Sequence, residues 1–204
     1  MIETIEQIIT SIEHSWQNIV DDCRLVLGSE LHYQAMIYYN LRLYGKIPIN
    51  QIGMNVKIRI DKPKSKLFID KDKSKHPDFQ GHFEPIPDIA IFKTQINSDW
   101  RRRNYKNTFK NLLYAIEIKA SERENKRLSY KEITDDIDKL NALQFECKSK
   151  KNDIGVAIII IDTAILPDEQ MTKDTIEELV IYSKSKNVSF LYLSQENQQK
   201  IFEI

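Results

Sequence analysis

Two short apolar runs that carry charged residues constrain the fold of this chain more than any other feature. The first run spans Glu84–Phe92 and the second spans Leu112–Ala120. Each is rich in isoleucine and is bounded by turn or charged residues, which is typical of buried strands. Side chains alternate on a strand, so Glu117 and Lys119 share one face of the second run. The sequence therefore predicts two core strands that carry charged side chains.

Charged side chains on a core strand are costly unless they are paired or bind a metal ion. The first run contributes Asp88 and the second contributes Glu117, followed two residues later by Lys119. Mg²⁺ prefers oxygen ligands in octahedral geometry, so we expect Asp88, Glu117 and the backbone carbonyl of Ile118 to bind Mg²⁺ or Mn²⁺. Lys119 lies ~6.6 Å along the strand from Glu117, within reach of a four-carbon side chain. The alternative interpretation is a structural salt-bridge cluster at the end of a sheet.

Pro87-Asp88 and Glu117-Ile118-Lys119 resemble the signature of the PD-(D/E)xK nuclease superfamily, which has the restriction-endonuclease-like fold. The order of elements is similar too. A helix that carries Glu30 near its start precedes the strands, and a helix that contains residues 135–140 follows them. The resemblance covers about residues 28–193.

This resemblance implies a metal-dependent nuclease that hydrolyses phosphodiester bonds of nucleic acid, with DNA favoured over RNA. Asp88, Glu117, Lys119 and Glu30 would be catalytic, and the acids among them would bind the metal ion. Lys119 would orient the attacking water, help to deprotonate it or neutralise developing negative charge. One alternative is a catalytically inactive binding module of the same fold, for nucleic acid or protein. Another is a toxin or defence effector that a separate chain switches on.

The second expected helix offers two further candidates. In the family, an acid at the position of Glu30 completes the metal site or binds a second ion. Gln34 is one turn further along and is expected to face the same cleft and to contact nucleic acid. A structural reading of Glu30 also holds, because an acid just after an N-cap residue is favoured by the helix dipole alone.

Basic residues are concentrated in two segments, although the formal net charge of the 204 residues is 0. Residues 57–75 carry a net charge of +5 and residues 99–131 a net charge of +6. Local charge decides phosphate contacts, so these segments favour nucleic acid as a partner. Aromatic residues alternate with Arg and Lys residues at 100–106, as in protein surfaces that bind the nucleic-acid backbone and stack on its bases. The expected nucleic-acid contacts are Arg101, Arg102, Arg103, Lys106 and Lys139.

A purely structural role is the alternative interpretation of these basic residues. Residues 100–106 would then form a solvated loop whose Trp100 packs on the core. The lysines of 61–75 would lie on a solvated hairpin. Asp136 and Lys139 would form an i,i+3 surface pair on a helix.

The pattern of elements predicts an α/β fold with a central mixed sheet flanked by helices. Apolar residues at helical spacing over residues 2–27 predict an N-terminal amphipathic helix, followed by a nuclease-like domain at 28–204. The apolar stripe of this helix must be buried on the domain or against a second copy. Nucleases of this fold often dimerise, so the resemblance favours a homodimer.

Further elements follow from local signals. We expect strands at 54–60, 154–161 and 188–193, a brief strand at 67–69, and helices at 29–44, 129–148 and 172–186. Ser129 is the expected N-cap of the helix at 129–148. Two isolated cysteines give no disulfide framework and no zinc spacing, which favours a reducing, cytoplasmic location. No run is long enough to span a membrane, so no membrane partner is expected.

Overall fold

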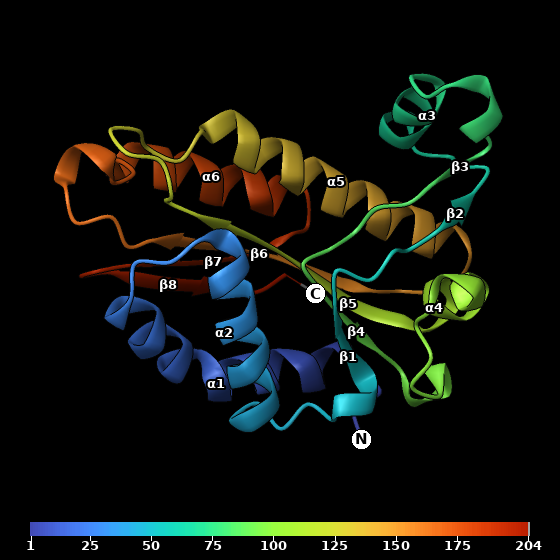
Figure 1. Cartoon of the computed structure of the whole chain (residues 1–204), viewed down its shortest axis with the longest axis horizontal. Coiled ribbons are helices and arrows are strands. Elements are labelled where there is room, and N and C mark those ends of the chain that lie inside the picture. Colours follow the sequence, from blue (N-terminus) through green and yellow to red (C-terminus); the bar gives the residue numbers. More distant parts are fainter. Residues whose placement is uncertain (204) are drawn as a thin grey trace.

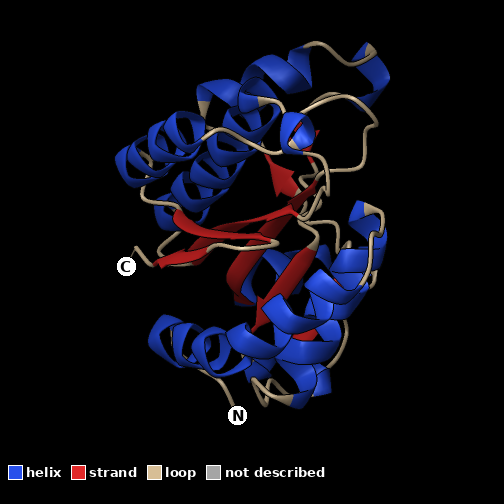
Figure 2. Cartoon of the chain, turned by 90° about the vertical axis from the view of Figure 1, so that its left-hand side faces the viewer, coloured by secondary structure: helices blue, strands red, loops and turns tan. Residues whose placement is uncertain are grey.

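A computed structural model describes residues 1–203 and shows a mixed sheet between two layers of helices (Figures 1 and 2). The six strands of this sheet are ordered β1-β4-β5-β6-β7-β8. Their bounds are β1 Ile52–Met54, β4 Ile89–Phe92, β5 Leu112–Ala120, β6 Gly155–Asp162, β7 Ser189–Ser194 and β8 Gln198–Ile201. The expected α/β class with a mixed sheet flanked by helices is confirmed.

Helices cover both faces of the sheet. Figure 1 shows α1 and α2 on one face and α5 and α6 on the other. The helix bounds are α1 Ile5–Leu25, α2 Glu30–Leu43, α3 Lys66–Lys73, α4 Tyr105–Asn111, α5 Tyr130–Ser149 and α6 Lys173–Ser185. None of the helices within residues 1–203 is long and apolar enough to cross a membrane.

The centre of the sheet is parallel and its edges are antiparallel. β5, β6 and β7 pair in parallel, whereas β4 runs antiparallel to β5 and β8 antiparallel to β7. β6 is buried along its whole length, as expected for a strand with helices on both sides. The two-stranded ribbon β2 (Ile60–Asp61) and β3 (His82–Phe83) stands apart from this sheet, next to α3 (Figure 1).

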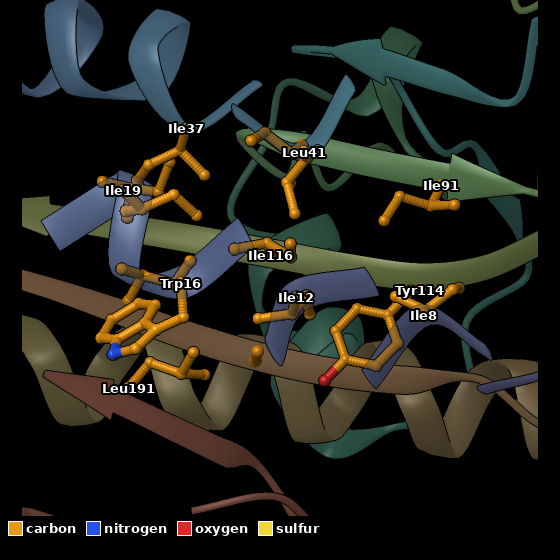
Figure 3. Close-up of a cluster of buried hydrophobic side chains, with 14 of the residues drawn as sticks. Ile8, Ile12, Trp16, Ile19, Ile37, Leu41, Ile91, Tyr114, Ile116 and Leu191 are labelled. Carbon is orange, nitrogen blue, oxygen red and sulfur yellow. The ribbon is translucent and has the colours of Figure 1, made fainter. Parts of the chain in front are cut away.

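Side-chain alternation divides the core into two layers. On β5, Tyr114, Ile116 and Ile118 pack against α1 and α2 (Figure 3). Ala115 belongs to the layer beneath α5 and α6. By the same alternation, Glu117 and Lys119 point toward the α5 face.

The stripe of α1 is part of this core. Ile12 and Ile19 are fully buried, and Trp16 is 2% exposed (Figure 3). A capping box between Thr4 and Gln7 begins the helix. The stripe is buried within a single chain, so its burial does not require a second copy.

A close approach between two strands requires glycine at the start of β6. A Cβ atom on Gly155 would lie 2.2 Å from the ring of Tyr114, which is itself fully buried. The absence of a side chain at Gly155 therefore lets the Tyr114 ring pack across the neighbouring strand.

The segment between β1 and β4 differs from the prediction. The strand expected at 54–60 is replaced by β1, which ends at Met54, and by the short β2. The brief strand expected at 67–69 is wrong, because these residues lie in α3. Ser65 caps this helix, and the Phe68 ring stacks on Phe83 with ring centroids 4.6 Å apart.

Candidate active site

The register of two strands brings the predicted carboxylates together. Ile89 of β4 pairs with Ile116 of β5, so Asp88 lies opposite Glu117 at the adjacent position. One carboxylate oxygen of Asp88 accepts the Ile118 N–H at 2.7 Å. The N–H and C=O groups of one strand residue point the same way, so the Ile118 carbonyl faces Asp88 as well. The Ile118 carbonyl therefore faces the strand that Asp88 precedes, and the Glu117 side chain leaves β5 at the adjacent position, on the α5 face.

Burial and mutual repulsion disfavour ionisation of both acids at once. Burial raises the pKa of Asp88 to about 6, helped by the nearby Glu30 carboxylate and opposed by the Ile118 N–H. Burial is also the main reason that the pKa of Glu117 is well above its usual value, and the carboxylates of Asp88 and Asp136 raise it further. Burial is thus the main cause of both shifts, and like-charge proximity to Asp88 adds to the shift at Glu117.

Lys119 lies between two acids from different helices. Its ammonium nitrogen lies 3.2 Å from a Glu30 carboxylate oxygen and 3.1 Å from one of Asp136. Burial lowers the pKa of Lys119, but the carboxylates of Asp136 and Glu30 outweigh this effect and raise it overall. Lys119 is therefore a persistent ammonium ion, which suits it to neutralising negative charge rather than to accepting a proton.

Glu30 begins α2, and the Ser29 side chain caps that helix. The helix thus delivers Glu30 to the end of the sheet, where its carboxylate binds the Lys119 ammonium. In this arrangement the Glu30 carboxylate pairs with the lysine and lies near enough to Asp88 to raise the pKa of that acid.

Gln34 holds the backbone of Asp88 in place. Its amide donates to the Asp88 backbone carbonyl, which also accepts the Asn55 N–H at 3.0 Å. The Asn55 side chain in turn donates to Gln34 at 3.3 Å. Gln34 is 2% exposed. The expectation that it contacts nucleic acid is therefore corrected: it is a buried brace for Asp88.

Asp136 is the residue of this site that sequence reasoning did not assign. It lies on α5 and is 5% exposed. Besides Lys119 it binds the Lys139 ammonium, so the pair expected on the helix surface is partly buried in the site. A signal was present in the sequence, since Asp136 lies three residues after Ile133 and four before Leu140, on the apolar face of its helix.

A cleft of about 380 Å³ lies beside the Lys119 ammonium. Its walls come from α2, the end of β5, the loop at 121–128 and the first turns of α5. The charged side chains of this lining are Glu30, Lys119, Glu122, Arg123, Lys126, Arg127, Glu132, Asp135, Asp136 and Lys139.

The basic stretch at 101–106 lies elsewhere. It connects the end of β4 to α4, whereas the acids lie at the start of β4 and toward the end of β5 (Figure 1). The seven residue-to-residue steps from Leu112 to Lys119 span about 23 Å of strand. The structure therefore does not bring Arg101, Arg102, Arg103 or Lys106 into the cleft.

Two of these arginines are already paired. Arg101 binds Asp99 through two nitrogens at 2.7 and 2.8 Å, and Arg102 binds Glu84 at 3.1 Å. The Trp100 ring stacks on Phe92 with ring centroids 5.9 Å apart, which agrees with the alternative that Trp100 packs on the core. Arg103 and Lys106 are exposed.

The donor atoms of the acid pair suit a hard cation. Two carboxylates and a backbone carbonyl form an all-oxygen set, and Mg²⁺ is usually bound by one or two carboxylates together with waters and substrate phosphate. Within residues 1–203, no group of three or more His, Cys, Asp or Glu side chains is arranged to hold a metal ion. The pair of Asp88 and Glu117 therefore fits Mg²⁺ or Mn²⁺ and lacks the nitrogen and sulfur ligands that zinc takes.

Comparison of the chain with family models, with curated proteins and with solved structures found no match.

Proposed function

We propose that this chain has a restriction-endonuclease-like core and is a metal-dependent nuclease, with DNA as the favoured substrate. The observation that carries the proposal is the placement of Asp88 opposite Glu117 with Lys119 on the same face of β5. Two half-buried carboxylates whose ionisation is mutually unfavourable make a site in which a divalent cation relieves the repulsion.

Asp88, Glu117 and the Ile118 carbonyl would hold Mg²⁺ or Mn²⁺. When bound, the ion would polarise the phosphodiester and lower the pKa of a bound water. The Ile118 N–H fixes the Asp88 carboxylate, and Gln34 fixes the backbone of the same residue. Rigid ligands of this kind favour a defined site over a mobile one.

Lys119 supplies positive charge next to these ligands. Charge that develops on the phosphoryl oxygens is stabilised best by groups that are already oriented. The carboxylates of Glu30 and Asp136 orient the ammonium in this way. A lysine with a raised pKa is fully protonated at neutral pH, so we assign it electrostatic stabilisation and not proton abstraction.

The second candidate is an inactive binding module. The observation that favours it is the same ion-pair network, because Lys119 is neutralised by two carboxylates within the chain. In that case the charged cluster would stabilise the end of the sheet and carry no chemistry.

Incubation of purified protein with supercoiled plasmid, single-stranded DNA and RNA separates the two candidates. Each substrate is tested with Mg²⁺, with Mn²⁺ and with EDTA. The proposal expects cleavage with a divalent ion and none with EDTA or with Glu117→Gln. Glu177→Gln on α6, where the acid forms an exposed pair with Lys173, is the matched control and should cleave normally. Cleavage that persists in EDTA or in Glu117→Gln would contradict the proposed mechanism.

A further inference from the structure

The cleft next to Lys119 is lined by charges that are almost all paired. Glu30 and Asp136 bind Lys119, and Lys139 binds Asp136. These contacts neutralise the inner wall of the cleft.

The charged side chains nearer the rim have partners as well. Arg123 binds Glu132 at 3.0 Å, and Asp135 binds Lys131 at 3.0 Å. The Glu122 carboxylate accepts the backbone N–H at the start of α2.

Lys126 and Arg127 are the exceptions. Both are exposed, both line the cleft, and neither has an ion-pair partner within 4.0 Å among residues 1–203. Arg127 also lowers the pKa of the buried Asp162 through longer-range attraction. The cleft therefore presents two cations that are not held in an ion pair, next to the Lys119 ammonium.

The loop that carries these two cations is anchored at several points. The Ser121 N–H donates to the Ile161 carbonyl at 3.0 Å, and the Ala164 N–H donates to the Ser121 hydroxyl at 3.2 Å. Further along, the Asn125 N–H donates to Glu169 at 2.6 Å. These hydrogen bonds to residues 161–169 hold the loop that carries Lys126 and Arg127 in place and reduce the ordering entropy that ligand binding would cost.

We propose that Lys126 and Arg127 bind the phosphodiester backbone of the nucleic-acid strand that enters this cleft. The inference rests on the proposed function, because it takes the substrate class from the adjacent acid pair. Guanidinium groups bind phosphate through two parallel hydrogen bonds, and ammonium groups bind it as point charges. Loop 121–128 thus replaces the stretch at 101–106 as the expected backbone-binding element.

Binding is tested with a short fluorescent single-stranded oligonucleotide in EDTA, by anisotropy over a series of salt concentrations. Lys126→Ala/Arg127→Ala should weaken binding by roughly 25-fold at 0.1 M salt, since each single-strand phosphate contact adds about 0.7 to the slope of log K against log salt. The slope itself should fall by about 1.4. The charge-preserving variant Lys126→Arg/Arg127→Lys should bind nearly as well as the parent.

The matched control is Lys184→Ala/Lys200→Ala, which removes the same charge from exposed positions on α6 and β8. It should leave affinity and slope nearly unchanged. An equal loss of affinity in both double variants would overturn the proposal, because the net charge of the protein alone would then explain the loss. Parental affinity in Lys126→Ala/Arg127→Ala, or no binding by the parent protein, would overturn it too.

Cleavage of the same oligonucleotide in Mg²⁺ separates this inference from the proposed function. One outcome is that Lys126→Ala/Arg127→Ala loses affinity, the control double variant does not, and the parent never cleaves. Hydrolysis is then refuted and the binding role of the loop stands. If the parent cleaves and the double variant binds normally, hydrolysis stands and the loop assignment is refuted.

Discussion

The Asp136 carboxylate of α5 lies 3.1 Å from the Lys119 ammonium of β5. A helix that packs over the sheet thus fixes the position of a charged group on a core strand. The same acid also binds Lys139, so one carboxylate orders two cations at the edge of the cleft.

Replacing Asp136 by asparagine tests whether this contact positions Lys119. The amide keeps the shape of the side chain but loses the charge that orients the ammonium. We expect kcat for nucleic-acid cleavage to fall about 10- to 100-fold, as for groups that orient a metal-site residue, with KM nearly constant. Steady-state kinetics measure both. Equal kcat values in Asp136→Asn and in the control Glu177→Gln would show that the contact has no role in turnover.

The acid pair predicts stabilisation by divalent ions. An ion that binds only the folded chain raises its stability by about 2.7 kcal/mol at 100 times Kd. For a chain of 204 residues this corresponds to a rise in Tm of roughly 5–10 °C. Thermal unfolding of the parent should show this rise with Mg²⁺ or Mn²⁺, and Glu117→Gln should not. The same rise in both proteins would place the ion away from Asp88 and Glu117.

Asp162 should make stability depend on pH. The residue is fully buried; one carboxylate oxygen accepts from the Met171 N–H at 2.7 Å and from the Tyr192 hydroxyl at 3.0 Å. The other oxygen has no partner. Burial raises the pKa of Asp162, and the hydrogen bonds from Met171 and Tyr192 only partly offset that effect.

A raised pKa means that the folded state holds this proton more tightly than the unfolded chain does. The stability that Asp162 contributes is complete below its unfolded-state pKa of about 3.9 and is lost as pH rises through the higher folded-state value. Asp162→Asn removes this dependence, so its stability relative to the parent should increase from pH 4 to pH 8 in urea unfolding. Parallel stability curves for the two proteins would refute the assignment.

Trp16 should be essential for the core beneath the sheet. It is 2% exposed and packs within the layer formed by α1, α2 and the strands (Figure 3). Trp16→Ala should lower the free energy of unfolding by about 3–5 kcal/mol, the usual cost of truncating a large buried aromatic residue. Leu25→Ala on the same helix, at a position 80% exposed, should change it by less than about 0.5 kcal/mol. Similar values for both variants in denaturant unfolding would contradict the packing of α1.

Local patterns predicted the parts of this chain that depend on neighbours in sequence. Alternation placed Glu117 and Lys119 on one face of β5, and Ser129 caps α5 as expected. Placing Asp88 opposite Glu117 also required the register between two strands, which no single run of residues specifies.

Contacts between distant segments explain most of what the sequence did not predict. Asp136 reaches Lys119 only because α5 crosses the sheet above β5. Arg102 pairs with Glu84, a residue from before β4. α3 forms at residues that read as a strand, since Glu146 of α5 accepts the N–H groups of Lys64 and Ser65 at 2.6 Å and fixes the start of the helix. β8 was missed because its exposed polar residues carry no apolar pattern.

Single-turnover cleavage by Lys119→Ala under saturating Mg²⁺ tests the central claim most directly. A group that acts only in the transition state lowers the rate of the chemical step and leaves affinity for the substrate unchanged. We predict a rate about 10²–10³-fold below the parental rate, with nucleic-acid binding nearly intact. Lys119→Arg should restore only part of the loss, because a guanidinium is larger and planar. Cleavage by Lys119→Ala at the parental rate would contradict lysine-assisted, metal-dependent hydrolysis at this site.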